Sequence, residues 1–415
     1  MGRPIAIRTG RALDVAGGRY RNGVTFLLEG DRIEQLLDRP DQLPDGTELV
    51  DLQGLTVVPG LIDTHSHLVG EVQTAGVPAT TTSAAQDALL GVRNARATIE
   101  AGFTTVRDVG TFRAFVDCAL RDAIEAGDVV GPRMQCAGGF ITAPWGGGDV
   151  VGLAHDIALP EELRFGVVTG PDEVRERVRR LLIGGADLIK CIATGAVLTR
   201  GGVPGAPELS EAELRAAVEE AAWYGRFVAA HAHGAEGARR AIRAGVRSIE
   251  HGSYLDDETI RMLADSGTFL SVDLYDGEWA LEHGGPQGWP AETMRKLAES
   301  QVAAEAVFRR AAGAGVAIAF GTDSGVYPHG LNARQFGSYV RCGMSPLEAI
   351  RTATIVAAAC MGWSDRVGSL EPGRFADLVA VAGDPLEDVT ELERPVVVIK
   401  GGRVVRDDRP RKLTG

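Results

Sequence analysis

Two histidines lie two residues apart at the end of an apolar segment, and this spacing suits the binding of a metal ion. The segment is Leu61-Ile62-Asp63-Thr64, and His65 and His67 follow it with one serine between them. If the segment is a β-strand, side chains two residues apart share a face, so both imidazoles can bind one cation. A single His-x-His pair is a weak signal, so its meaning depends on whether further ligands end other strands.

Four more polar residues end short apolar segments in the same way. They are Lys190 after 186–189, His231 after 227–230, His251 after 248–250, and Asp323 after 319–322. In a parallel barrel the carboxyl ends of all the strands meet on one face. Because six such residues at equivalent strand ends are improbable by chance, we predict that they converge on one small volume as a metal centre.

Lys190 is the unusual member of this set, because a protonated amine cannot bind a divalent cation. Burying an unpaired ammonium beside metal ions would also be unfavourable. Reaction of the amine with carbon dioxide would convert it into a carboxylate able to bridge two metals, a modification that a sequence does not display.

From about residue 101 onward, short segments rich in valine, isoleucine and leucine alternate with segments of helical period, which is typical of parallel βαβ units. We predict strands at 104–108, 133–137, 188–192, 227–231, 248–251, 268–272 and 316–323, besides the one that ends near Asp63. Helices are predicted at 171–183, 210–224 and 290–312, and Ser210 with Glu213 forms a capping box. Eight strands favour the α/β class and a closed (β/α)8 TIM barrel over an open sheet.

The two ends of the chain have a different pattern. Residues 4–57 and 366–408 contain short alternating segments, little helix, and turn signals such as Glu29-Gly30-Asp31 and Lys400-Gly401-Gly402. We therefore expect a small discontinuous β-sandwich domain from residues 1–57 plus 366–415, and a barrel domain from 58–365.

Composition restricts the class of partner and the compartment. The chain carries 43 basic and 56 acidic residues, a formal charge of −13 that is spread along the sequence, so nucleic acid and membranes are not expected partners. The N-terminus does not resemble a signal peptide, and the five cysteines contain no C-x-x-C pair. We expect a cytoplasmic protein with reduced thiols that forms a homo-oligomer.

Ordered motifs over nearly the whole chain resemble the amidohydrolase superfamily. Besides Lys190 and His231, the motifs are Val57-Val58-Pro59-Gly60-Leu61-Ile62-Asp63-Thr64-His65-Ser66-His67, Glu250-His251-Gly252, Gly321-Thr322-Asp323-Ser324 and Gly368-Ser369-Leu370-Glu371-Pro372-Gly373-Arg374-Phe375-Ala376-Asp377-Leu378. The chain looks most like the prolidase and carboxypeptidase-like branch, which includes dipeptidases and ochratoxin-type amidases.

This resemblance implies a role for each predicted ligand. His65, His67 and Asp323 would hold a buried metal and His231 and His251 a more exposed one, with Zn²⁺ as the expected metal and N6-carboxylated Lys190 as the bridge. A hydroxide between the metals would attack the amide bond of a small substrate, such as a dipeptide or N-acyl amino acid. Asp323 would pass its proton to the leaving amine.

His233 leaves two readings of the mechanism open. It should face the same way as His231, and the resemblance favours a contact with the substrate carboxylate or carbonyl. His233 and Glu236 also match the H-x-x-E pattern of mononuclear deaminases and imidazolone hydrolases, in which Glu236 would be the proton shuttle. Lys190 argues against that alternative, and the complete ligand set argues against a third one, a catalytically silent scaffold.

The substrate contacts depart from the resemblance at one loop. Many relatives carry a histidine after the third strand, whereas this chain has Gly146-Gly147-Gly148. Tyr327 or His329 could replace that histidine, and the guanidinium group of Arg200 or Arg334 would suit an α-carboxylate. His155 and His283 are not expected to be ligands.

Overall fold

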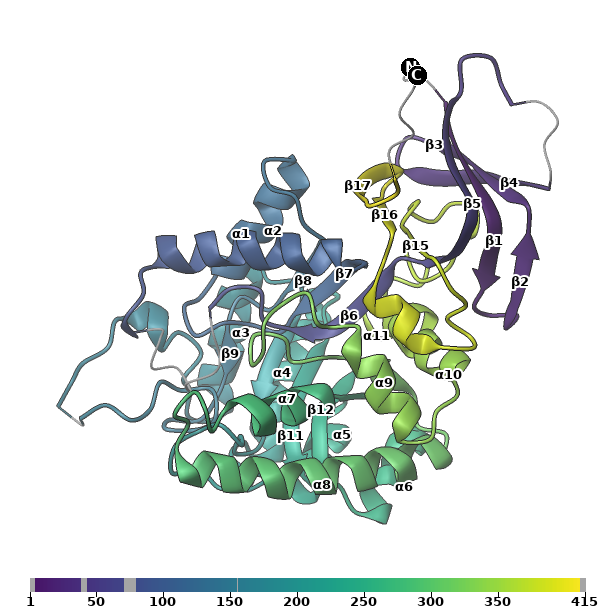
Figure 1. Cartoon of the computed structure of the whole chain (residues 1–415). Coiled ribbons are helices and arrows are strands. Elements are labelled where there is room, and N and C mark those ends of the chain that lie inside the picture. The colour runs from purple at the N-terminus through teal and green to yellow at the C-terminus, as the bar shows by residue number, and fades with distance from the viewer. Residues whose placement is uncertain (1–3, 39–42, 71–79, 155, 411–415) are drawn as a thin grey trace. The chain divides into compact units, whose positions relative to one another are not determined.

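The computed structural model describes residues 4–38, 43–70, 80–154 and 156–410 (Figure 1). The chain forms two compact units. The first consists of Met1–Asp63, Arg96–Thr105 and Gly330–Gly415, and the second of Thr64–Ala95 and Val106–His329.

In the first unit both ends of the chain contribute to one eight-stranded sheet. Its strands are β1 (Ile5–Asp14), β2 (Arg19–Asn22), β3 (Val24–Glu29), β4 (Arg32–Asp38), β5 (Glu48–Pro59), β15 (Leu378–Val381), β16 (Val397–Lys400) and β17 (Arg403–Asp407). The order is β17-β16-β15-β5-β1-β3-β4, with β2 paired to β1. The two predicted turn signals lie between β3 and β4 and between β16 and β17, and positive φ angles at Gly30, Gly401 and Gly402 explain the glycines there.

The helical part of the first unit follows residue 333. It contains α9 (Arg334–Arg341), α10 (Pro346–Arg351), the π-helical turn Thr352–Val356, α11 (Ala357–Cys360) and the 3-10 turn Val389–Glu393. The sheet has its own apolar core, in which Ile7, Phe26 and Val57 from the N-terminal segment pack with Leu378 and Ile399 from the C-terminal one.

The second unit is built on parallel strands. β9 (Phe140–Ile141), β10 (Ile189–Ile192), β11 (Val228–Gly234), β12 (Ser248–Tyr254), β13 (Phe269–Val272) and β14 (Ile318–Phe320) form a six-stranded sheet in the order β14-β13-β12-β11-β10-β9. β6 (Leu61–Ser66), β7 (Phe103–Asp108) and β8 (Arg133–Cys136) form a three-stranded sheet, and β6 and β7 begin in the first unit. Nearly every residue of these strands is buried, which explains their continuous apolar runs.

Backbone hydrogen bonds join the two sheets at both sides. The carbonyl of His65 in β6 accepts from the amide of Asp323, just after β14, at 2.8 Å. On the other side the carbonyl of Cys136 in β8 accepts from the amide of Asp187, just before β10, at 2.7 Å.

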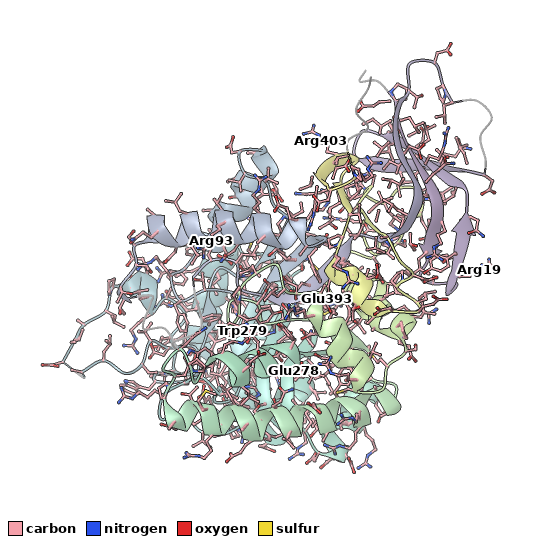
Figure 2. The ribbon with its side chains drawn as sticks, in the orientation of Figure 1. Arg19, Arg93, Glu278, Trp279, Glu393 and Arg403 are labelled. Atoms are coloured by element: carbon pink, nitrogen blue, oxygen red, sulfur yellow. The ribbon has the colours of Figure 1, made fainter. Side chains whose placement is uncertain are left out.

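Helices alternate with these strands as predicted. They are α1 (Ala84–Glu100), α2 (Val116–Ala126), the 3-10 turn Glu161–Leu163, α3 (Pro171–Ile183), α4 (Glu211–Trp223), α5 (Ala235–Ala244), α6 (Asp257–Ser266), α7 (Tyr275–His283) and α8 (Ala291–Gly313). The capping box of Ser210 and Glu213 at the start of α4 is confirmed. In α7, which carries the labelled Glu278 and Trp279 (Figure 2), the indole stacks on His283 at 4.6 Å between ring centroids.

All eight predicted strands are present, but several of their ends were wrong. The last was predicted to reach Asp323, yet β14 ends at Phe320, three residues before Asp323, whose φ of 52° lies outside the usual strand region. β11 and β12 continue past His231 and His251 to Gly234 and Tyr254. Their pairing shifts register between Ala232 and Gly234, and this irregularity accommodates the φ of 70° at His251 without ending the strand.

Candidate metal centre and substrate cavity

A cavity lies in the second unit at the carboxyl ends of the strands. The six predicted ligands all line it: His65, His67, Lys190, His231, His251 and Asp323. His233 lines it as well, together with Gly147 and Gly148 of the glycine-rich loop. Much of the remaining wall is apolar, including Phe112, Phe140, Ile192, Leu297 and Val326.

The two histidines of β6 face one carboxylate. The Nε2 atoms of His65 and His67 lie 3.5 Å and 3.3 Å from Oδ1 of Asp323, and the two ring centroids are 5.5 Å apart. This confirms that the i and i+2 positions share a face. It also places the carboxylate where a cation between these three side chains would be bound.

Asp323 owes its position to an unusual backbone. Its φ of 52° turns the chain after β14, and its amide donates to the carbonyl of His65 at 2.8 Å. A Cβ atom at Gly321 would lie 2.7 Å from the Cβ of His65, so only glycine allows β6 to approach this closely. Positive φ at a non-glycine residue costs free energy, and such residues concentrate at functional sites.

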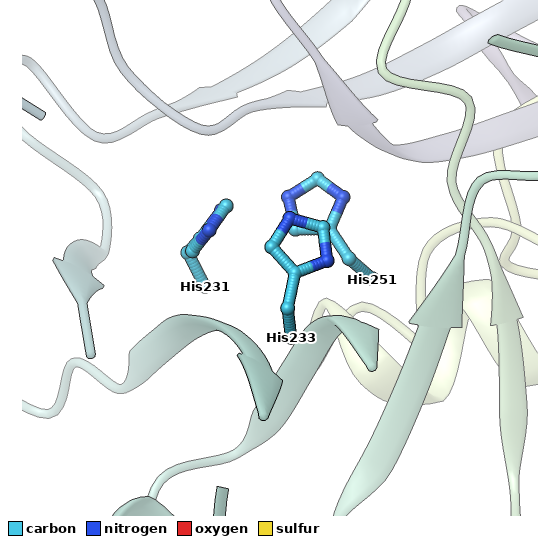
Figure 3. Close-up of side chains that lie close together, drawn as sticks. All are labelled: His231, His233 and His251. Atoms are coloured by element: carbon cyan, nitrogen blue, oxygen red, sulfur yellow. The ribbon is translucent and has the colours of Figure 1, made fainter. Parts of the chain in front are cut away.

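A second group of side chains comes from β11 and β12. His231, His233 and His251 each offer a nitrogen within 4.8 Å of the others, and their rings turn toward a common volume (Figure 3). The ring of His251 lies 4.4 Å from that of His231 and 4.7 Å from that of His65. His251 therefore connects this group with a second one, formed by His65, His251 and Asp323.

Two buried polar atoms of the cavity have no hydrogen-bond partner among the described residues. They are Nε2 of His231 and Oδ1 of Asp323. Unsatisfied buried polar atoms are costly, and a bound cation is one of the explanations for keeping them.

Burial sets the protonation of four histidines of the cavity. It lowers the pKa of His65 to about 3 and of His251 to about 4, and it lowers the pKa of His231 and His233 well below the usual value. These four imidazoles are neutral, as metal ligands must be. At His67 the effect of burial is outweighed by Asp323, which raises the pKa of this histidine above its usual value.

The charged groups of the centre respond to burial and to their neighbours. The amine of Lys190 on β10 is 1% exposed, and burial lowers its pKa to about 8 despite the nearby carboxylates of Glu250 and Asp323. Burial alone would raise the pKa of Asp323, but His67 and His65 hold it below its ordinary value.

The residues that hold the ligand histidines in place were not predicted from the sequence. Glu250 Oε2 lies 2.9 Å from Nδ1 of His65, and its other oxygen accepts from Arg107 at 2.8 Å, with all three side chains buried. Asp273 lies 2.8 Å from Nδ1 of His251. Asp273 directly follows the apolar run 268–272, so the criterion used for the ligands could have found it, whereas nothing in its sequence context distinguishes Arg107.

The cavity also has a carboxylate that the sequence analysis did not consider. Asp276, in the first turn of α7, lines it, and its carboxylate lies within 4.8 Å of those of Asp273 and Asp323. Burial and the two neighbouring aspartates raise its pKa well above the usual value.

The predicted substrate contacts other than His233 are not among the residues that line the cavity. Tyr327 is fully buried against the ring of Tyr275, at 5.1 Å between centroids, and Nε2 of His329 lies 3.0 Å from the carbonyl oxygen of His67. Arg200 is exposed. Arg334 lies in the first unit, where it is exposed and 4.0 Å from Glu393.

Glu236 and the two remaining histidines are also placed. Glu236 lies on α5, is 46% exposed and pairs with Arg239 and Arg240, and it is not part of the described cavity lining. His283 stacks on Trp279, and His155 lies outside the described residues.

Comparison with known proteins shows which family this chain resembles. The sequence model that describes the amidohydrolase family matches residues 56–405 of this chain. The ochratoxinase of Aspergillus niger is 34% identical over 378 residues, which cover 84% of this chain and 75% of that protein. A solved Xaa-Pro dipeptidase with bound methionine is 37% identical with a TM-score of 0.90, over 97% of this chain and 99% of the other. A prolidase complexed with N-methylphosphonate-L-proline is 31% identical with a TM-score of 0.91, over 97% and 100%.

The chain therefore belongs to the amidohydrolase family, whose members generally use divalent metals. Within it, the chain falls in the branch of the prolidases and ochratoxinase, and it is a hydrolase that acts on carbon–nitrogen bonds. In the described part of the chain, no helix is both long enough and apolar enough to cross a membrane.

Proposed function

We propose that this chain hydrolyses the amide bond of a dipeptide or an N-acyl amino acid with two divalent metal ions, most simply Zn²⁺. The observation that carries this proposal is that two possible ligand groups, His231 with His233 and His251, and His65 with His251 and Asp323, adjoin in one cavity. One cation would satisfy the donors of only one group.

The residues present fit such a pair of metals. His65, His67 and Asp323 would hold one ion, and His231 and His251 the other, which would give partners to Nε2 of His231 and Oδ1 of Asp323. Lys190 would bridge them as an N6-carboxylated side chain. The deep burial of Lys190 supports this. Two bound cations would compensate the negative charge of a buried carboxylate, whereas the positive charge of an ammonium group beside them would stay uncompensated.

Bound cations would lower the pKa of water and polarise the scissile carbonyl group. Asp323 is the base in this arrangement, because its carboxylate reaches the centre of the ligand set, and the oxygen that does not bind a metal can accept a proton from the attacking water. The same carboxyl group would then protonate the leaving amine. His233, which lines the cavity beside the ligands, would donate a hydrogen bond to the carbonyl or carboxylate of the substrate.

The proposed substrate class has two supports. Relatives that cover most of this chain are an ochratoxinase and a Xaa-Pro dipeptidase, and the cavity combines the ligand set with an apolar wall that can take an acyl or side-chain group. The placement of Glu236 argues against the mononuclear alternative, because this carboxylate is exposed and engaged with two arginines on α5.

The architecture proposed for this enzyme is a closed barrel of eight strands, β6, β7, β8 and β10 to β14. It is supported by the hydrogen bonds that join the two sheets of the second unit at both sides. The predicted domain bounds, 58–365 for the barrel and 1–57 plus 366–415 for the discontinuous β-domain, a cytoplasmic location and a homo-oligomeric state remain proposals.

Metal counting combined with a substrate panel tests the proposed function. Purified protein should contain about two zinc or equivalent divalent ions per chain, and it should hydrolyse dipeptides or N-acyl amino acids. One ion per chain with activity on cyclic amides or amino-heterocycles would establish the mononuclear alternative instead. Mass spectrometry under non-denaturing conditions should show the added mass of the Lys190 carboxylate.

A further inference from the structure

The histidines of the centre differ in what faces their Nδ1 atoms. For three of them the facing group is a carboxylate or a carbonyl, which accepts a hydrogen bond from an N–H group. These pairs are His65 with the carboxylate of Glu250 at 2.9 Å, His67 with the carbonyl of Gly110 at 2.7 Å, and His251 with the carboxylate of Asp273 at 2.8 Å.

An acceptor at Nδ1 determines the tautomer of a neutral imidazole. The proton must lie on Nδ1, so that Nε2 keeps its lone pair. An unprotonated Nε2 is what a metal ligand requires, and outer partners of this kind orient ligand rings in metal sites. All three histidines with acceptor partners belong to the proposed ligand set.

His233 has a different partner. Its Nδ1 lies 2.9 Å from Oγ of Ser253, and a hydroxyl group can donate as well as accept. The two side chains are 5% and 4% exposed, and both line the cavity. The backbone amide of His233 donates to Oγ1 of Thr194 at 3.0 Å, which holds the residue in place.

The ring of His233 is close enough to the ligands to compete for a metal. It stacks on His251 at 4.8 Å with an interplanar angle of 24°, and it lies 4.6 Å from His231 (Figure 3). Distance therefore does not separate His233 from the ligands, whereas its Nδ1 partner distinguishes it from His65, His67 and His251.

We propose that Ser253 is a positioning residue whose hydroxyl donates to Nδ1 of His233. The proton of the imidazole then lies on Nε2, which cannot bind a metal in that state and instead presents an N–H donor to a carbonyl or carboxylate oxygen of the substrate. The inference rests on the proposed function, since it explains why one of three adjacent histidines contacts substrate.

The tautomer can be read directly by NMR of the zinc-loaded full-length protein. With only eight histidines in the chain, long-range ¹H–¹⁵N correlations of ¹⁵N-histidine-labelled enzyme are tractable, and His233→Gln identifies the resonances of His233. We expect a protonated Nε2 and an unprotonated Nδ1 at His233, and the opposite at His65, His67 and His251. A protonated Nδ1 at His233 would overturn the inference, whether or not the enzyme has the expected substrate.

A double-mutant cycle provides the functional test. Ser253→Ala should lower kcat/KM roughly 10-fold with metal content unchanged, and Ser253→Thr, which keeps the hydroxyl, should restore most of it. In a His233→Gln background, Ser253→Ala should have little further effect, because Ser253 acts through His233. Ser338→Ala, which removes a buried hydroxyl in the first unit, is the matched control for any loss of activity that comes from removing a buried hydroxyl group as such.

The outcomes separate this inference from the proposed function. Additive losses in the cycle would refute the role of Ser253, because they would show that it does not act through His233. Loss of a metal ion on His233→Gln would also refute the inference, because it would make His233 a ligand. The proposed function would be refuted if the wild-type protein bound one ion per chain or cleaved no amide. The tautomer of His233 could still be measured in that case. Co²⁺-substituted enzyme adds a check, since Ser253→Ala should leave its visible spectrum unchanged.

Discussion

Replacing Arg107 should weaken both the fold and the metal centre. The guanidinium group is completely buried, and it donates to the carbonyl of Thr64 at 2.5 Å, to Ser248 at 3.1 Å and to Glu250 at 2.8 Å. Burial alone would raise the pKa of Glu250, but Arg107 and His65 hold it well below its usual range. Arg107→Met leaves that carboxylate buried beside His65 without its cation.

The expected size of the effect follows from this burial. Removing one partner of a buried ion pair costs about 3–5 kcal/mol. For a chain of 415 residues this corresponds to a fall in Tm of roughly 3–6 °C. Because Glu250 orients His65, metal affinity should also fall, by about 10- to 100-fold.

Two assays and two further variants test this reasoning. Calorimetry measures Tm, and competition with a chelator followed by elemental analysis measures metal affinity. Arg107→Met combined with Glu250→Gln should be less destabilised than Arg107→Met alone, since the uncompensated charge is gone. Arg96→Ala, which breaks an exposed pair with Glu100, should cost less than about 1 kcal/mol. A Tm and metal affinity equal to wild type in Arg107→Met would refute the role given to this pair.

Three further predictions follow from the centre and its surroundings. Asp323→Asn should keep most of the metal but lower kcat by about 10²- to 10⁴-fold, and a variant with near-normal kcat would exclude Asp323 as the proton carrier. Lys190→Ala should reduce metal content per chain as well as rate, so full occupancy by elemental analysis would argue against the bridge. Burial lowers the pKa of His329 to about 4, below its unfolded value near 6.5, so its stabilising contribution is complete above about pH 6.5 and is lost as pH falls toward 4. His329→Gln should therefore flatten the fall in unfolding free energy between those pH values in denaturant titrations, and an unchanged slope would contradict this.

Much of the site could be predicted from the residues alone, because strand ends are local features. A polar residue directly after a buried apolar run is visible in the sequence, and parallel strands must bring such residues to one side. His65, His67, Lys190, His231, His251 and Asp323 were found by this criterion, and the structure places all six on one cavity.

Only the tertiary structure could decide what surrounds those residues. Arg107 contacts Glu250, Glu250 contacts His65, and Ser253 contacts His233, and in each pair the two residues are distant in sequence. Neither the distance between two such side chains nor the tautomer of a histidine can be recognised from the local sequence. The structure also separated Glu236, which faces solvent on α5, from His233, which lines the cavity, although the two residues are only three positions apart in the H-x-x-E pattern. The local sequence therefore determines which polar residues follow the buried apolar runs, whereas packing of remote segments determines which nitrogen of each histidine is free to bind a metal.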